Sequence, residues 1–166
     1  MSEPDDFSTC DLCDAHMGSV GTALQVLPPV FRDYGGRPRF SGVVGTVKCF
    51  EDNSILRVVV GEPGQGRVLV IDGGGSLRRA LVGGNIAATA AGNGWAGLVV
   101  HGAVRDAAEL AACAIGIRAL ALVPLPTEKR NQGEREVAVQ IEGVWVRPGD
   151  RLYADADGIV VIAAPA

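Results

Sequence analysis

The stretch that decides the fold is Arg67-Val-Leu-Val-Ile-Asp72, which is followed at once by Gly73-Gly-Gly75 and Ser76. A continuous apolar run that ends in an acid is typical of a β-strand covered on both faces. Two more short apolar runs follow it, Gly97-Leu-Val-Val-His101 and Ala119-Leu-Ala-Leu-Val123. The strand pattern therefore predicts three buried strands in the middle of the chain.

The segments around these strands complete the prediction. Helices are expected at Thr9–Val20, at Asn53–Gly61, from Ser76 to about Leu81, at Asn85–Asn93 and from Asp106 to about Cys113. Further strands are expected at Phe40–Phe50, Val137–Gln140, Val144–Val146 and Gly158–Ile162. Residues 127–136 are expected as a mobile loop, and residues 1–8 as disordered. The sequence predicts one α/β domain over residues 1–166, with a central βαβαβ unit flanked by β-strands.

Composition excludes several classes of protein. The chain has 166 residues and a net charge of −4, so it offers no basic face for the phosphates of a nucleic acid. Its apolar runs are shorter than the roughly 20 residues of a membrane helix. The acidic start differs from a secretory signal, so we expect a cytoplasmic protein with no membrane contact. The 4 cysteines are then expected as reduced thiols.

Three motifs have plain structural explanations beside a functional one. Cys10-x-x-Cys13-x-x-His16 has part of the spacing of a zinc site but no second pair of ligands, so packed cysteines are the favoured explanation. The Asp72–Ser76 loop is similar to a nucleotide or methyl-donor loop. It lacks the last glycine of the G-x-G-x-x-G motif and the Lys-Ser/Thr pair of the P-loop, so a tight turn is the favoured explanation. His101, at a strand end, is expected to be a packed side chain rather than a base.

The best functional candidate combines two turns. Gly83-Gly84-Asn85-Ile86 opens a predicted helix, whose first backbone amides can hold a carboxylate. Arg105-Asp106 follows the next strand along the chain, and ligands collect where parallel strands end. Arg105 is suited to a carboxylate or keto oxygen, and Asp106 to Mg²⁺ or Mn²⁺. A surface ion pair between Arg105 and Asp106 is the alternative.

Several segments together make the chain similar to a known family. They are Tyr34-Gly-Gly-Arg-Pro38, Thr46-Val-Lys-Cys-Phe-Glu-Asp-Asn53, Arg67–Arg78, His101-Gly-Ala-Val-Arg-Asp106, and Pro148-Gly-Asp150 with Leu152–Gly158. From about Thr9 to Ile162 the sequence resembles the RraA-like family, which contains regulators of ribonuclease E activity and class II 4-hydroxy-4-methyl-2-oxoglutarate aldolases. The separation of Gly84 and Arg105 also fits that family.

The resemblance implies a fold, an assembly and a site. The fold would be a layered β/β/α swivelling-type domain, assembled as a homotrimer or a hexamer with sites between subunits. Backbone amides of Gly83–Ile86 would hold the pyruvyl carboxylate. Arg105 would bind substrate and steady the enolate, and Asp106 would hold the divalent metal through a hydrated shell.

The implied function is a metal-dependent lyase that releases pyruvate from a 2-keto acid. Its substrates would be 4-hydroxy-4-methyl-2-oxoglutarate, by aldol cleavage, and oxaloacetate, by decarboxylation. Two alternatives remain open at this point: a non-catalytic inhibitor that binds ribonuclease E, and a methyltransferase that acts on demethylmenaquinone. The lyase would require Arg105 and Asp106, whereas pure docking on ribonuclease E would not.

Overall fold

One mixed sheet organises the molecule, which a computed structural model describes over residues 6–165. Within that range the sheet has ten strands. Eight of them follow one another across it in the order β1 (Leu24–Val26), β12 (Gly158–Ile162), β11 (Arg151–Asp155), β3 (Phe40–Lys48), β4 (Val68–Asp72), β6 (Gly97–Val104), β7 (Gly116–Leu122) and β2 (Arg32–Asp33). The other two are β5 (Ala80–Val82), which pairs with β6, and β8 (Glu134–Arg135), which pairs with β3.

The centre of the sheet is parallel, as the buried apolar runs predict. Strands β3, β4, β6 and β7 run parallel to one another, with Val70 opposite Thr46 on one side and Val99 on the other. The strands at both ends of the sheet pair antiparallel. The chain therefore has a mixed α/β fold that contains the predicted βαβαβ unit.

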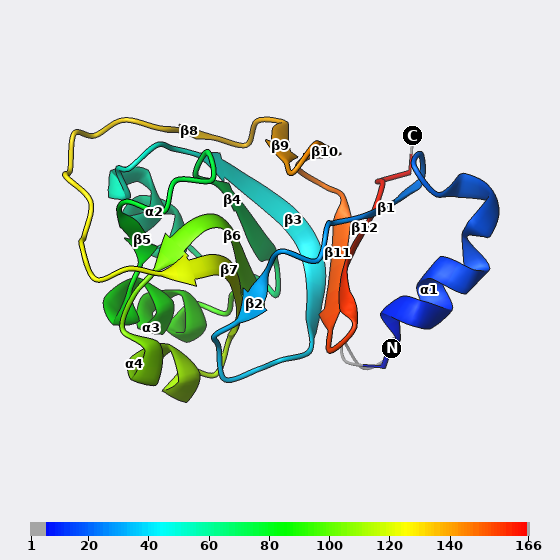
Figure 1. The fold of residues 1–166 in the computed structure, drawn as a ribbon, viewed down its shortest axis with the longest axis horizontal. Coiled ribbons are helices and arrows are strands. Elements are labelled where there is room, and N and C mark those ends of the chain that lie inside the picture. Colours follow the sequence, from blue (N-terminus) through cyan, green and yellow to red (C-terminus); the bar gives the residue numbers. More distant parts are fainter. Residues whose placement is uncertain (1–5, 166) are drawn as a thin grey trace.

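Both faces of the parallel strands are covered, which explains the apolar run in β4. Leu69 and Ile71 belong to a core cluster shared with the helices α2 (Ser54–Val60), α3 (Gly84–Gly92) and α4 (Ala107–Ala112). Val68 and Val70 belong to a second cluster, shared with β11, β12 and a two-stranded sheet of β9 (Val139–Ile141) and β10 (Val144–Val146). Figure 1 shows the three helices together on one side of the parallel strands.

The amino-terminal helix α1 (Thr9–Ala15) lies on the other side, beside β11 and β12 (Figure 1). Ser8 caps α1, since its side chain accepts from the Asp11 amide. The helix is shorter than the predicted Thr9–Val20, because it ends at Ala15 and is followed by the 3₁₀ turn η1 (Met17–Ser19). Of the segment expected as disordered, residues 1–5 lie outside the described residues, and the Phe7 ring contacts Tyr153 at 5.2 Å between centroids.

One predicted helix does not form, and one five-residue strand was not predicted. The expected helix from Ser76 to about Leu81 does not form; residues 80–82 are instead the strand β5, which pairs in parallel with β6. Strand pairing in the folded molecule therefore overrides the local capping signal of Ser76. The strand β11 was not predicted, because its five residues lie between two strong turn signals.

Residues 127–136, which were expected as a mobile loop, are held to the rest of the molecule by several hydrogen bonds. Strand β8 lies within them, and the backbone amides of Arg130 and Gln132 both donate to Asp52 Oδ2, at 2.8 and 3.2 Å. In the described part of the chain even the longest helix, α3, has nine residues, far fewer than the roughly 20 of a membrane-spanning helix.

Candidate active site

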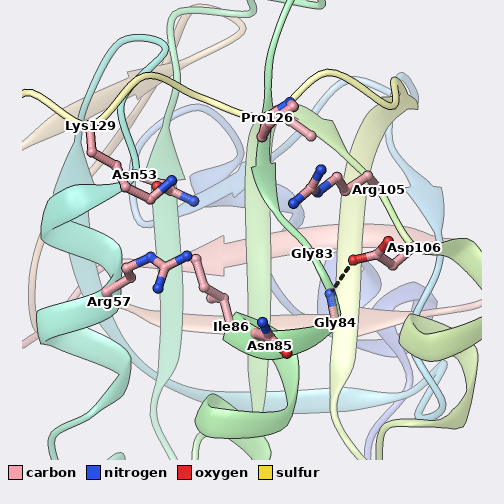
Figure 2. A pocket seen from close by; sticks show the side chains of 11 residues that line it. Asn53, Arg57, Gly83, Gly84, Asn85, Ile86, Arg105, Asp106, Pro126 and Lys129 are labelled. Carbon is pink, nitrogen blue, oxygen red and sulfur yellow. Dashed lines mark hydrogen bonds between the residues drawn. The ribbon is translucent and has the colours of Figure 1, made fainter.

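The two turns predicted to form the site lie side by side. Strands β5 and β6 are parallel, with Val82 opposite Val104, so the chain leaves both strands at the same edge of the sheet. The Arg105 amide donates to the Val82 carbonyl at 2.9 Å and fastens one turn to the other. Gly83 to Ile86, Arg105 and Asp106 line a single pocket there (Figure 2). Strand β5, which forms where a helix was predicted, therefore places the Gly83–Ile86 turn at the site.

The Asp106 carboxylate joins the two turns directly. The Gly84 amide donates to Asp106 Oδ2 at 2.9 Å, the contact drawn in Figure 2. Asp106 has φ 65° and ψ 51°, a left-handed conformation that is uncommon outside glycine. It stands at the start of α4 without capping that helix, because its side chain caps α3 instead.

The Arg105 guanidinium is not paired with its neighbour. Arg105 Nη1 donates to the Pro124 carbonyl at 3.4 Å, and no ion pair joins Arg105 to any carboxylate within residues 6–165. The surface ion pair with Asp106 considered above is therefore absent from this part of the chain. A cation with weak internal partners is available to an anionic ligand.

The first turn of α3 supplies backbone donors. The Gly84 amide is already bonded to Asp106, which differs from the expectation that it also faces substrate. For the amides of Asn85 and Ile86, the described residues show no acceptor. These two amides sit at the positive end of the helix and are the donors that remain for a carboxylate.

Five further residues that the sequence did not single out line the pocket: Asn53, Arg57, Ala80, Pro126 and Lys129. In Figure 2 the side chains of Arg57 and Lys129 come from the wall opposite Arg105 and Asp106. Asn53 is buried and locked, because its amide group donates to Leu81 O at 2.9 Å and accepts from Thr127 Oγ1 at 2.8 Å. One feature of the sequence could have predicted this wall. Helix α2 follows β3, and β3 is a parallel strand that ends at the same edge of the sheet as β5 and β6.

Glu109 is a second carboxylate that the sequence analysis missed. A Cβ atom placed on Gly84 would lie 1.7 Å from Glu109 Oε2, so this carboxylate occupies the space beside the diglycine. A Cβ on Gly83 would lie 2.7 Å from Asp106 Oδ2. The missing side chains of Gly83 and Gly84 therefore make room for two carboxylates. The spacing of Asp106 and Glu109, one turn apart on α4, was the available signal.

The carboxylate oxygens at the pocket are better suited to a hydrated divalent cation than to a zinc ion in a closed site. Among residues 6–165 no three His, Cys, Asp or Glu side chains come together as a ligand cluster. Asp106 is exposed, and no cation pairs with it in the described residues, so lone pairs remain free at the pocket. Mg²⁺ and Mn²⁺ accept one or two carboxylates and keep water in their other positions. Asp106, with Glu109 near it, suits such an ion.

The other candidate motifs lie outside this pocket. In the Asp72–Ser76 loop, Gly73 and Gly75 donate to His101 O and Gly74 donates to Asp72 Oδ1, so these amides are not free for a phosphate or a methyl donor. His101 lies between two carboxylates, with Nδ1 3.9 Å from Asp72 and Nε2 3.7 Å from Glu142. Burial alone would raise the pKa of Asp72, but its contacts with His101 and Gly74 lower it.

The amino-terminal Cys10-x-x-Cys13-x-x-His16 motif lies on and just after α1. Cys10 is exposed and His16 Nδ1 lies 2.8 Å from the Leu12 carbonyl. These residues take part in no metal-ligand cluster within the described chain.

Comparisons with known proteins show what this chain is similar to. The sequence profile of the RraA-like family, described as Aldolase/RraA, matches residues 9–161. A protein of Albidiferax ferrireducens named "Putative 4-hydroxy-4-methyl-2-oxoglutarate aldolase" is 62% identical over 165 residues, which are 95% of each chain. The structure of the RNA-processing inhibitor RraA from Thermus thermophilis has a TM-score of 0.91 at 47% identity and covers 97% of this chain and 95% of that one.

A second solved structure is nearly as similar. It is described as an S-adenosylmethionine: 2-dimethylmenaquinone methyltransferase from Geobacillus kaustophilus HTA426, and it has a TM-score of 0.90 at 42% identity, with 96% of each chain covered. The family profile and these relatives each extend over almost the whole length of the protein. The chain therefore belongs to the RraA-like family.

Proposed function

We propose that this chain is a class II, metal-dependent lyase that cleaves a carbon–carbon bond of a 2-keto acid and releases pyruvate. Its aldol substrate would be 4-hydroxy-4-methyl-2-oxoglutarate, the compound in the name of the 62% identical relative, and it would also decarboxylate oxaloacetate. The observation that carries this proposal is the convergence of Arg105, Asp106 and the start of α3 on one pocket, joined by the 2.9 Å bond from Gly84 to Asp106.

The charge of the pocket suits a small acid. Arg57, Arg105 and Lys129 outnumber the one acid among its lining residues, Asp106. A cationic pocket favours an anionic substrate.

Each residue has a role that follows from its position. The amides of Asn85 and Ile86 bind the carboxylate of the pyruvyl half at the start of α3. Arg105 holds the keto oxygen, on which negative charge accumulates during cleavage. Asp106, steadied by Gly84, would hold a Mg²⁺ or Mn²⁺ ion, with Glu109 as a second carboxylate nearby. The bound ion would supply a positive charge that stabilises the enolate oxygen.

The same arrangement serves two reactions. In aldol cleavage the C3–C4 bond breaks, its electron pair becomes part of the pyruvate enolate, and the 4-hydroxyl passes its proton to water as the second carbonyl forms. In decarboxylation the C3–C4 bond of oxaloacetate breaks and C4 leaves as carbon dioxide. Both reactions pass through the pyruvate enolate, which then takes a proton at C3. Because Arg105 stabilises the charge on that enolate, both reactions depend on Arg105 in the same way.

The test is pyruvate production from each substrate, with and without Mg²⁺ or Mn²⁺, followed by a coupled lactate dehydrogenase assay and corrected for the metal-catalysed blank. We expect turnover that EDTA abolishes and that either metal restores. Arg105→Ala should lower kcat about 100- to 1,000-fold, the usual cost of removing a charge stabiliser from the transition state. Asp106→Ala should abolish the metal dependence.

Two results would reject the lyase. One is a wild-type protein that releases no pyruvate above the blank from either substrate with either metal. The other is an Arg105→Ala or Asp106→Ala variant that keeps wild-type rates with Mg²⁺. Tight binding of S-adenosylmethionine in a calorimetric titration would instead favour the methyltransferase.

Ribonuclease E inhibition is the second candidate function, because the 47% identical Thermus protein is described as an RNA-processing inhibitor. A docking protein does not need its Arg105 side chain for chemistry. If inhibition is a property of this chain, purified ribonuclease E should lose activity when the protein is added, and Arg105→Ala should inhibit equally well.

Three properties accompany the lyase proposal. The mixed sheet with its layered clusters supports a β/β/α swivelling-type fold, and the family resemblance supports a homotrimer or hexamer that works in the cytoplasm. Light scattering of the purified protein at several concentrations measures the assembly, and a mass of one chain would reject it.

A further inference from the structure

A second hollow borders the active-site pocket. It lies between α2 and α3 and is lined by Arg57, Val60, Asn85, Ile86 and Thr89. Arg57, Asn85 and Ile86 line both spaces, so the two hollows are neighbours beside the first turn of α3.

The roles proposed above set the direction in which a substrate points. Its carboxylate lies at the amides of Asn85 and Ile86, and its keto oxygen lies toward Arg105 and Asp106. The carbons beyond C3 must then extend away from Arg105. Figure 2 shows that Arg57 and Lys129 occupy that opposite wall.

Arg57 has the properties of a ligand-binding arginine. It is exposed on the last turn of α2, and within residues 6–165 no hydrogen bond or ion pair is made by its side chain. A guanidinium can bind a carboxylate through two parallel hydrogen bonds, which a lysine cannot do. Val60 and Ile86 line the hollow beside it.

We propose that Arg57 binds the second, distal carboxylate of the substrate and thereby selects dicarboxylic 2-keto acids over monocarboxylic ones. The inference rests on the proposed function and adds to it a residue that determines specificity. In aldol cleavage the distal carboxylate stays on the departing product, so Arg57 can hold it throughout the reaction. In oxaloacetate the distal carboxylate is itself lost as carbon dioxide, so holding it there assists binding but not bond cleavage.

The experiment compares two aldol substrates that differ in the distal carboxylate: 4-hydroxy-4-methyl-2-oxoglutarate, which has it, and 4-hydroxy-2-oxopentanoate, which lacks it. We expect Arg57→Gln to lower kcat/KM for the first about 10- to 100-fold, the usual value of hydrogen bonds to a charged group. The second substrate should change less than about 2-fold, and Arg57→Lys should recover only part of the loss.

Two further measurements make the result specific. Exchange of the pyruvate methyl protons with deuterated water uses only the pyruvyl half of the site, so Arg57→Gln should leave its rate unchanged. For oxaloacetate, the variant should raise KM with little change in kcat. Arg32→Gln, which removes an exposed arginine on β2 away from the pocket, is the charge-matched control.

The outcomes separate this inference from the function beneath it. A wild-type protein without lyase activity or pyruvate exchange rejects the proposed function and the inference with it. An active wild type whose preference for the dicarboxylate survives in Arg57→Gln rejects the inference alone. Loss of that preference in Lys129→Gln, with Arg57→Gln unchanged, would assign the distal carboxylate to Lys129 and also overturn the proposal.

Discussion

At the scale of single residues, Asp106 combines a strained backbone with a structural hydrogen bond and a position in the site. Its left-handed conformation, φ 65° and ψ 51°, is one that Asn and Asp adopt more readily than other residues with a Cβ. Its carboxylate satisfies the Gly84 amide, one of the donors that a helix start leaves unpaired. Replacing it therefore affects folding as well as chemistry.

Two substitutions separate these effects. Asp106→Ala should lower the free energy of unfolding by about 1–2 kcal/mol, because it removes the cap of α3 and places alanine in a left-handed conformation. Asp106→Asn keeps an acceptor and tolerates that conformation, so it should cost less than about 0.5 kcal/mol. Urea denaturation measures both. Equal stability of Asp106→Ala and wild type would show that the Gly84 contact does not hold α3.

Gly84 gives a second prediction at this scale, because its missing side chain leaves room for Glu109. In Gly84→Ala the new Cβ would lie 1.7 Å from Glu109 Oε2, so the flexible Glu109 side chain must move aside. We expect a folded protein whose lyase kcat falls, and whose activity Glu109→Gln lowers no further in the double variant. Steady-state kinetics of the two single variants and the double variant check this.

Gly92 offers a matched control on the same helix. A Cβ there would meet nothing within 4 Å, so Gly92→Ala should leave activity unchanged and stabilise α3 by about 0.5–1 kcal/mol. Activity loss of similar size in both alanine variants would contradict the role given to Gly84, since it would point to a general effect on α3.

At the scale of elements, the sequence predicts best where burial is strongest. The runs that became β4, β6 and β7 are apolar on both faces, and the two core clusters on either side of the sheet are the physical reason. Helix α3 follows from the diglycine that precedes it and from its alanines. In each case the local pattern and the final packing favour the same structure.

The sequence fails where pairing with a distant strand decides. Residues 80–82 form only a short strand, whose pairing with Ala103 and Val104 and whose bond from Ala80 N to Leu125 O cannot be read from a local pattern. The site follows the same rule. Arg105-Asp106 was predicted because it follows a buried strand, and the diglycine because it opens a helix. Arg57 and Lys129 instead reach the pocket through the arrangement of α2 and of residues 127–136.

Asp52 fastens the segment that carries Lys129 and gives a prediction at this scale. Burial alone would raise its pKa, but hydrogen bonds from Ser54, Arg130 and Gln132 lower the pKa to about 2. In Asp52→Asn one carboxylate oxygen is replaced by an NH2 group, which cannot accept a hydrogen bond, so the contacts with Ser54 and those with the loop amides can no longer all be kept. We expect tryptic cleavage after Lys129 or Arg130 to become faster and the KM for substrate to rise.

Limited proteolysis with mass spectrometry identifies the cleavage sites. Asp14→Asn, at an exposed position on α1, is the control and should be cut at the wild-type rate. Cleavage after Lys129 or Arg130 that is equally fast in wild type and Asp52→Asn would show that Asp52 does not fasten this segment.

At the scale of the whole molecule, several buried carboxylates join distant parts of the chain. Asp155 accepts from the Thr9 amide at 2.8 Å and from Thr9 Oγ1 at 2.7 Å, which attaches α1 to β11. Burial alone would raise the pKa of Asp155, but these bonds lower it. Asp52 and Asp72 behave in the same way. The charged form of each carboxylate is therefore the one that the folded state stabilises.

The stability of the fold should then fall in acid. For a carboxyl whose pKa is lower in the folded protein, the stabilisation is complete above the unfolded pKa of about 4 and is lost as the pH falls through the folded value. For Asp52, whose folded pKa is about 2, this contribution is of the order of 2 kcal/mol. Urea denaturation should give a constant free energy of unfolding between about pH 7 and pH 5 and a decline below about pH 4. The decline should be shallower in Asp52→Asn, which has no carboxyl to protonate, and a wild-type curve that stays level down to about pH 3 would show that these carboxylates do not hold the fold together.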